Sequence, residues 1–148
     1  MSLLYSIVTY SALGIGALIT LFAPLIVHII YGTAYNATIP VLRISAWYIV
    51  FSYVGMIRNI WILAEGHQKY LMPINGFGAL CNIGLNYILI PVIGISGAAV
   101  ASVLTQFLTN VVVSYMIPAT RRSVILLLKG LHPHYIYDAI RRMQGNQE

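Results

Sequence analysis

Acidic side chains are almost absent from this 148-residue sequence, in which Glu65, Asp138 and Glu148 are the only three. Charged residues of both signs make up only 7% of the chain, whereas 59% of it is hydrophobic. A soluble domain carries about 25% charged residues, because its surface must stay hydrated. Folded in water, this chain would expose a large apolar surface and aggregate. The composition therefore excludes a soluble globular domain and predicts an integral membrane protein.

Cysteines and clusters of metal ligands are equally scarce. The single cysteine, Cys81, excludes a disulfide framework, and a lone buried thiol usually serves as a small apolar side chain. The four histidines are scattered and lack the spacing of a metal site: His28, His67, His132 and His134. The sequence also has no nucleophile elbow, carboxylate pair or glycine-rich phosphate loop. We therefore predict no catalytic residue, no metal and no cofactor, and a protein that is not an enzyme.

The basic residues are concentrated at one end of the chain. The net charge is +5, and five of the eight lysines and arginines lie beyond residue 120: Arg121, Arg122, Lys129, Arg141 and Arg142. A basic cluster beside apolar spans is typical of an orientation signal and of contacts with anionic lipid headgroups. We therefore expect this part of the chain to contact membrane lipids, and we expect no nucleic acid as a partner.

Four stretches are long and apolar enough to cross a bilayer, which takes about 20 helical residues for about 30 Å of hydrocarbon. The predicted spans cover residues 4–30, 40–63, 70–90 and 97–117. A polar loop at 31–38, a polar cluster at 65–69, and Pro91 with Gly94 separate them. The predicted fold is all-α: a polytopic membrane helix bundle of about four transmembrane helices over residues 1–118.

The distribution of charge predicts the orientation of these spans. The loop at 65–69 and the tail hold nearly all basic residues outside the spans, whereas the loops at 31–38 and 91–96 hold none. Lysine and arginine favour the cytoplasmic side, so both termini are predicted to be cytoplasmic. Arg43, near the external end of the second span, is the one exception. Residues 119–148 then form a basic cytoplasmic tail, either as amphipathic helices at headgroup level or as a partly ordered segment.

Three of the spans carry polar or small side chains along one helical face. The third span places Asn75, Asn82 and Asn86 within roughly 40° of one another at 100° per residue. The fourth span aligns Ser102, Thr105, Gln106 and Thr109 in the same way, and the second aligns Ser45, Tyr48, Ser52, Gly55 and Asn59. Such stripes mediate helix packing in many membrane proteins, but they also line cavities for polar substrates. Packing is the better explanation for any single stripe, whereas three stripes together predict that at least one lines a cavity.

Arg58 is a charged residue inside the second predicted span and has three interpretations. It lies five residues from the cytoplasmic end, so its side chain can extend to the headgroups. It can also pair with Glu65, seven residues later, at the membrane edge. The third interpretation is an anion-binding role in the cavity, although Arg58 lies roughly 100° from the stripe of polar residues on its own helix. The candidate cavity residues are Asn75, Asn82, Asn86, Ser102, Thr105, Gln106, Thr109 and Arg58.

The order of several segments resembles a known transporter family. Residues 31–35 (YGTAY), 37–43 (ATIPVLR) and 62–69 (ILAEGHQK) precede the most specific segment, NIGLNYILIPVIGISGAAVAS at residues 82–102. Over roughly residues 15–118 the chain resembles the carboxy-terminal part of Wzx-type polysaccharide flippases, the O-antigen and capsule exporters of the MOP superfamily.

The resemblance implies translocation of an oligosaccharide, carried on undecaprenyl pyrophosphate, across the bacterial plasma membrane. Such flippases have two lobes of six helices around a cation-lined cavity, in a MATE-like fold, and work by alternating access. The four spans would then be the last four of one lobe. Because alternating access needs two bodies, we expect a fragment of a longer carrier, the product of a split or truncated gene, or a subunit with a partner.

Two other functions remain open at this stage. A drug or cation antiporter of the same superfamily needs a buried carboxylate, and none of the predicted spans contains one. A non-transporting membrane scaffold in a polysaccharide-assembly complex would tolerate loss of the polar stripes.

Overall fold

The apolar stretches of the sequence fold into helices throughout the part of the chain that the computed structural model describes, residues 2–130. No strand occurs between those residues. The helices are α1 (Ser2–Ile30), α2 (Ile39–Ala64), α3 (Leu71–Ile93), α4 (Ile95–Phe107), α5 (Ser114–Met116) and α6 (Arg121–Gly130). Short 3-10 helices η1 (Thr33–Thr38) and η2 (Gln68–Tyr70) connect the long helices, and the π-helix η3 (Leu108–Val113) joins α4 to α5.

Four helical segments are long and apolar enough to cross a membrane: Tyr5–Ile30, Thr33–Ala64, Gln68–Ile93 and Ile95–Met116. The prediction of an all-α chain with four candidate transmembrane helices is therefore confirmed. The second half of the predicted basic tail, residues 131–148, lies outside the described residues.

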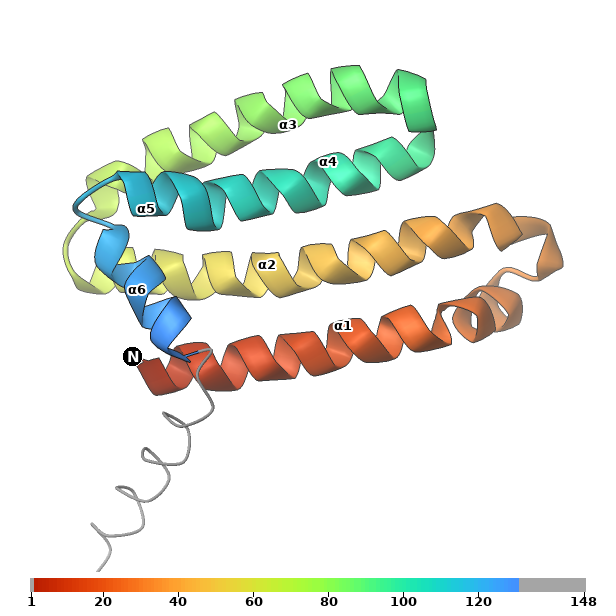
Figure 1. The fold of residues 1–148 in the computed structure, drawn as a ribbon, viewed down its shortest axis with the longest axis horizontal. Coiled ribbons are helices and arrows are strands. Elements are labelled where there is room, and N and C mark those ends of the chain that lie inside the picture. Colours follow the sequence, from red (N-terminus) through yellow and green to blue (C-terminus); the bar gives the residue numbers. More distant parts are fainter. Residues whose placement is uncertain (1, 131–148) are drawn as a thin grey trace, which may run out of the picture.

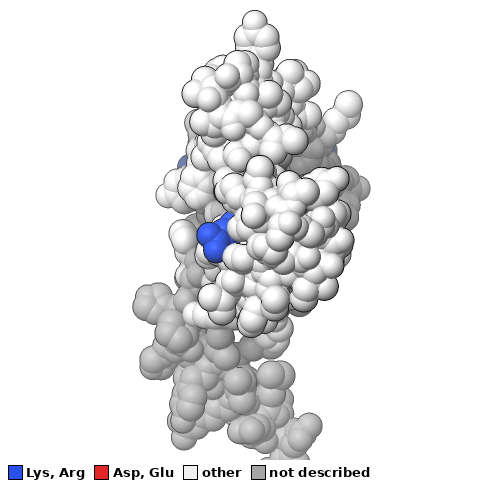
Figure 2. Space-filling view, turned by 90° about the vertical axis from the view of Figure 1, so that its right-hand side faces the viewer, with Lys and Arg blue, Asp and Glu red and all other residues white. Residues whose placement is uncertain are grey.

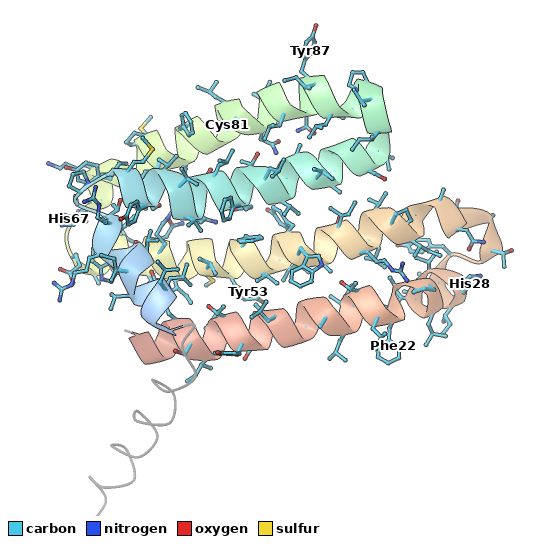
Figure 3. All side chains as sticks on the ribbon, in the orientation of Figure 1. Phe22, His28, Tyr53, His67, Cys81 and Tyr87 are labelled. Atoms are coloured by element: carbon cyan, nitrogen blue, oxygen red, sulfur yellow. The ribbon has the colours of Figure 1, made fainter. Side chains whose placement is uncertain are left out.

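The four long helices lie side by side in one layer, in the spatial order α1, α2, α4, α3 (Figure 1). Helices α1 and α2 form one antiparallel hairpin, α3 and α4 form a second, and the α2–α4 contact joins the two. The outer helices carry exposed apolar side chains, among them Phe22 on α1 and Tyr87 on α3, which point away from the layer (Figure 3). The predicted bundle is thus an open layer, with apolar edges suited to lipid.

Glycines with a left-handed backbone end two of the long helices, because only glycine adopts this conformation at little cost. Gly66 (φ 72°) follows α2 and Gly94 (φ 62°) follows α3. The sequence predicted that the third span would stop at Pro91, but α3 continues through Pro91 to Ile93. A proline in the last turn removes only one hydrogen bond, so the helix ends at the glycine.

Small residues allow the helices of the layer to approach closely. A Cβ atom built on Gly55 of α2 would lie 2.6 Å from Nδ2 of Asn110, and one on Gly78 of α3 would lie 2.6 Å from Oγ1 of Thr109. Near the α3–α4 turn, Gly97 lies directly against the carbonyl group of Leu89. These glycines therefore set the distances of α2 and α3 from the fourth span.

The first part of the predicted tail forms helix α6, which is amphipathic and packs its apolar side against the spans. Leu127 belongs to a buried cluster with Tyr5, Val54 and Ile57, so α6 covers one end of α1 and α2. The start of α1 and α6 therefore lie at the same end of the layer (Figure 1). Figure 2 looks onto the opposite end, where a small patch of basic side chain lies in an otherwise uncharged described surface.

Candidate functional site

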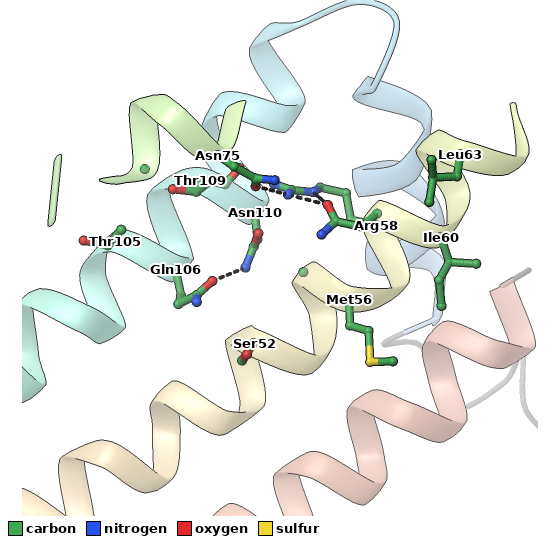
Figure 4. Close-up of a pocket in the computed structure, with 13 residues that line it drawn as sticks. Ser52, Met56, Arg58, Ile60, Leu63, Asn75, Thr105, Gln106, Thr109 and Asn110 are labelled. Carbon is green, nitrogen blue, oxygen red and sulfur yellow. Dashed lines mark hydrogen bonds between the residues drawn. The ribbon is translucent and has the colours of Figure 1, made fainter. Parts of the chain in front are cut away.

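A groove of about 430 Å³ opens between α2, α3 and the fourth span, and we call it the Arg58 groove. Figure 4 shows it from the side, with the Arg58 side chain reaching from α2 toward Asn75 on α3. Eight of its 13 lining residues have polar side chains; the full lining is Ser52, Gly55, Met56, Arg58, Asn59, Ile60, Leu63, Asn75, Gly78, Thr105, Gln106, Thr109 and Asn110.

The guanidinium of Arg58 is buried, with the residue 2% exposed, and is held by five hydrogen bonds. Nη2 donates to the side-chain oxygens of Asn59 (2.7 Å) and Asn75 (3.0 Å), and Nε donates to Asn59 (3.3 Å). Nη1 donates to the carbonyl oxygen of Thr109 (3.1 Å) and to Oγ of Ser114 (3.3 Å). An arginine has five N–H donors, so the hydrogen-bonding capacity of this one is fully used. All the acceptors are neutral, so the positive charge has no carboxylate partner within residues 2–130.

The π-helix η3 shapes the fourth-span side of the groove. A π-turn holds one more residue than an α-turn, which brings residues five apart to the same side of the helix. Thr109 and Ser114 are related in this way, and the Thr109 carbonyl accepts hydrogen bonds from both Arg58 and Oγ of Ser114 (3.0 Å). Such π-turns occur frequently at functional sites. Here the π-turn presents a backbone acceptor to the buried cation.

Asn110 joins α2 to the fourth span beside the buried cation. Its Nδ2 donates to the Phe51 carbonyl on α2 (2.8 Å) and to Oε1 of Gln106 (2.8 Å). The second bond is drawn in Figure 4. Gln106 is thereby oriented along the wall of the groove. Asn110 itself is 3% exposed, so its amide contributes to the positioning of this wall.

Two of the three sequence-based interpretations of Arg58 are wrong. Its side chain does not extend to the headgroups, because it is buried and bonded to Asn75 and Thr109 on neighbouring helices. It does not pair with Glu65, which is exposed after the end of α2. The angle of roughly 100° between Arg58 and the polar stripe of its helix does not keep Arg58 out of the groove. Although Arg58 projects away from the polar stripe of α2, its long side chain reaches the groove around the helix surface.

The structure brings together five of the eight candidate residues: Arg58, Asn75, Thr105, Gln106 and Thr109 line the groove. Asn82 and Asn86 do not line it. Nδ2 of Asn82 donates to Oγ1 of Thr105 (3.2 Å), and Nδ2 of Asn86 donates to Oδ1 of Asn82 (2.8 Å). The first bond joins α3 to α4 and the second lies within α3, so the two asparagines match the packing interpretation. Ser102 lies farther along α4, where its hydroxyl donates to the Ala98 carbonyl (2.9 Å).

Sequence reasoning missed Asn110 and Ser114 as functional candidates. Ser114 could not be found by projection at 100° per residue, because the π-turn changes the register between it and Thr109. Asn110 had a usable signal, since it lies four residues after Gln106 and therefore next to it on a helix.

The groove offers both donors and acceptors to a ligand. The Arg58 charge suits an anionic oxygen, and the amides of Asn59, Asn75 and Gln106 suit hydroxyl groups. Oγ1 of Thr109 is buried and has no partner among the described residues. No group of three or more histidine, cysteine or acidic side chains that could hold a metal occurs there either.

Comparison with known proteins gives no match: no protein-family model, no curated protein and no solved structure matches this chain.

Proposed function

We propose that this chain is part of a Wzx-type flippase that translocates a lipid-linked oligosaccharide across the bacterial plasma membrane. One observation carries the proposal: a buried arginine, without a carboxylate partner in residues 2–130, lies in a groove whose other polar groups are amides and hydroxyls. Ionisable residues inside transmembrane segments are costly and mark substrate pathways. The pyrophosphate of the carrier lipid would bind Arg58, and sugar hydroxyls would bind the surrounding amides.

The sign of the buried charge favours an anionic substrate over a cationic one. Hydrogen bonds from arginine to phosphate are charge-assisted and roughly twice as strong as those to neutral acceptors. A phosphate group can therefore displace neutral acceptors such as the amide of Asn75 from the guanidinium. A drug or cation antiporter would need a buried carboxylate, and Glu65, the one acidic residue in the described part of the chain, is exposed.

The open layer supports the view that the chain works with a second body. Alternating access requires two bodies that move about a shared site, and here the Arg58 groove lies on a single layer of helices. We propose that the layer belongs to one lobe of a MATE-like fold, completed by an amino-terminal lobe or a partner subunit. Both termini would face the cytoplasm, because the basic residues Lys69, Arg121 and Arg122 lie at the α6 end.

A scaffold function is favoured by a different observation. All five N–H groups of Arg58 are satisfied inside the protein, by groups on α2, α3 and the fourth span. Such a network would also serve only to hold three helices together in a non-transporting subunit of a polysaccharide-assembly complex. The flippase and the scaffold differ in the expected effect of removing the Arg58 charge: loss of translocation for the flippase and loss of folding for the scaffold.

The experiment replaces Arg58 and measures translocation of undecaprenyl-pyrophosphate-linked oligosaccharide in inner-membrane vesicles of cells that produce the protein. We expect Arg58→Gln to lower the rate about tenfold or more, the equivalent of about 1.4 kcal/mol of lost interaction. Arg58→Lys should keep part of the activity. Arg43→Gln is the matched control, because Arg43 lies on the same helix, is exposed and donates a hydrogen bond to the Thr20 carbonyl outside the groove.

A normal rate in a stably folded Arg58→Gln protein would refute the flippase proposal for this groove. Loss of folding in both Arg58→Gln and Arg58→Lys, measured by thermal unfolding in detergent, would support the scaffold.

A further inference from the structure

Three hollows adjoin one another along the contact between α2 and the fourth span, which we call the α2/α4 seam. The Arg58 groove is the first, and a hollow of about 390 Å³ lies toward the opposite end, between Ser45, Tyr48 and Ser102. A third, of about 470 Å³, lies on α2 between them. It shares Tyr48 with the second hollow and Ser52 with the Arg58 groove. The three hollows are therefore contiguous.

The seam lies on one side of the layer and is as long as the membrane core. On α2, Ser45, Ser52 and Asn59 are seven residues apart and so share one helical face. The lining extends on this helix from Val41 to Leu63, 22 residues later. At 1.5 Å per residue this is about 33 Å, compared with about 30 Å of hydrocarbon in a bilayer. A headgroup moving along the seam would cross the entire hydrocarbon region.

The two ends of the seam differ in chemistry. The Arg58 end has a charge and several amides, whereas the other end has only hydroxyls among its polar side chains, from Ser45, Tyr48 and Ser102. Its remaining lining is apolar and partly small, including Ala98 and Ala99. Hydroxyls both donate and accept hydrogen bonds, and an exposed aromatic ring can pack against the apolar face of a sugar. This end therefore matches a neutral carbohydrate.

The Arg58 end of the seam also contains a buried hydroxyl without a hydrogen-bond partner among the described residues. Thr109 is 5% exposed and lines the Arg58 groove, yet its Oγ1 has no hydrogen-bond partner among the described residues. Buried polar groups are almost always paired, and this hydroxyl packs against Gly78 of α3. A small shift of α3 would therefore let water or a ligand hydroxyl in the groove complete its hydrogen bonding.

We propose that the α2/α4 seam is one hydrated track for a glycan headgroup, with a neutral carbohydrate subsite at Ser45, Tyr48 and Ser102. This inference rests on the proposed function, since it assigns the pyrophosphate to Arg58 and the sugars to the rest of the seam. The apolar chain of the carrier lipid stays outside the seam, in the bilayer.

The first test measures access of water along the seam. In a Cys81→Ala background, single replacements Ser45→Cys, Ser52→Cys and Ser102→Cys are labelled with a membrane-impermeant thiol reagent in open membranes that contain the whole chain. Leu80→Cys and Ile83→Cys on α3 are the controls, because these residues are 71% and 66% exposed on an apolar surface suited to lipid. All three seam positions should react about tenfold faster than the controls. Equally slow labelling everywhere would overturn the hydrated track.

The second test separates the two ends. Labelling of Ser45→Cys, Ser102→Cys and Asn59→Cys is repeated with added undecaprenyl phosphate alone, or with the glycan-loaded carrier lipid extracted from producing cells. The glycan-loaded lipid should slow labelling at all three positions, whereas the carrier alone should slow it only at Asn59→Cys. The carbohydrate subsite would be overturned if the carrier alone protected Ser45→Cys from labelling. It would also be overturned if the glycan-loaded lipid failed to protect this position.

The outcome is independent of the translocation measurement. Glycan-dependent protection without translocation would refute the proposed function and leave the subsite standing. Translocation without such protection would refute the subsite alone.

Discussion

At the scale of single residues, the environment of Arg58 is the most informative feature of this protein. Its charge is stabilised by hydrogen bonds to neutral groups, above all to Asn59 (2.7 Å) and Asn75 (3.0 Å). Neutral acceptors satisfy the donors but leave the charge available to an anion. A carboxylate in the same place would compensate the charge and compete with any anionic ligand.

This difference between neutral and charged acceptors predicts that two substitutions of Asn75 change the stability of the fold in opposite directions. Asn75→Asp should stabilise the fold by about 1–2 kcal/mol, because a hydrogen bond between charged groups is stronger than one to an amide. It should nevertheless reduce translocation, because the new carboxylate forms an ion pair with Arg58 and competes with an anionic substrate. Asn75→Leu should destabilise the fold by about 1–3 kcal/mol, since it removes an acceptor from a buried charge.

Thermal unfolding in detergent and the vesicle translocation assay measure the two effects. Asn86→Asp is the control, because Asn86 bonds to Asn82 and does not line the Arg58 groove. Unchanged translocation in a stabilised Asn75→Asp protein would contradict the anion-binding role of Arg58.

At the scale of helices, close contacts at glycine hold the fourth span against its neighbours. Gly78 of α3 faces Thr109, and Gly55 of α2 faces Asn110, at distances that leave no room for a side chain. Both contacts fall on the π-helix η3, so the geometry that exposes the Thr109 carbonyl to Arg58 also depends on them.

We therefore predict that Gly78→Leu separates α3 from the fourth span and costs about 1–3 kcal/mol through overpacking. Gly84→Leu is the matched control on the same helix, because a Cβ atom there would meet nothing within 4 Å. The free energy of unfolding in detergent measures the difference. Equal stability of the two variants would show that the α3–η3 contact is loose in the membrane.

At the scale of the whole molecule, the open layer has two ends of different charge. Lys69, Arg121 and Arg122 lie at the end that α6 covers, and η1 with Gly94 forms the nearly uncharged end (Figures 1 and 2). The start of α1 also lies at the α6 end, as an even number of spans requires.

This arrangement predicts which turns can be labelled from outside the cell. In a Cys81→Ala background, the thiol introduced by Asn36→Cys should react with an impermeant reagent in intact cells. The thiol introduced by Gln68→Cys should react only after the membrane is permeabilised, because its turn lies at the basic end. The reverse pattern would overturn the predicted orientation.

Much of the fold followed from hydropathy, because crossing a membrane imposes a length and an apolar composition on each helix. The start of α2 at Ile39 and its end at Ala64 were each predicted within one residue. The single layer could not be predicted, since hydropathy describes each helix separately and does not specify its neighbours. The extension of α3 past Pro91 depended on the conformation of Gly94.

The candidate site was predicted in part, and the reason differs from residue to residue. Thr105 was found because α4 is regular there, and Thr109 because it is only the second residue of η3, so that projection of the sequence was still valid. Ser114 was missed because the π-turn breaks that regularity. Arg58 was kept as a cavity candidate, but the angular argument against it failed because projection locates the Cα atom and not the far end of a long side chain.

The partners of Arg58 have a consequence for how the protein is made. Asn75, Thr109 and Ser114 all follow Arg58 in the sequence, and only Asn59 belongs to the same helix. Synthesis proceeds from the amino terminus, so α2 is made before most of the groups that will hold its cation. A lone arginine at the centre of a transmembrane helix costs about 2.5–3.5 kcal/mol in insertion measurements, and near a helix end it can extend to the headgroups.

We therefore expect Arg58 to contact water at first and to become buried only when the fourth span arrives. In a Lys69→Arg background, the side-chain amine introduced by Arg58→Lys should react with a water-soluble reagent in chains stopped after residue 94 and be protected in the finished chain. Equal protection in both would show that α2 inserts with its cation already buried. The fourth span, which is the last helix of the layer to be synthesised, would then complete the burial of the α2 cation.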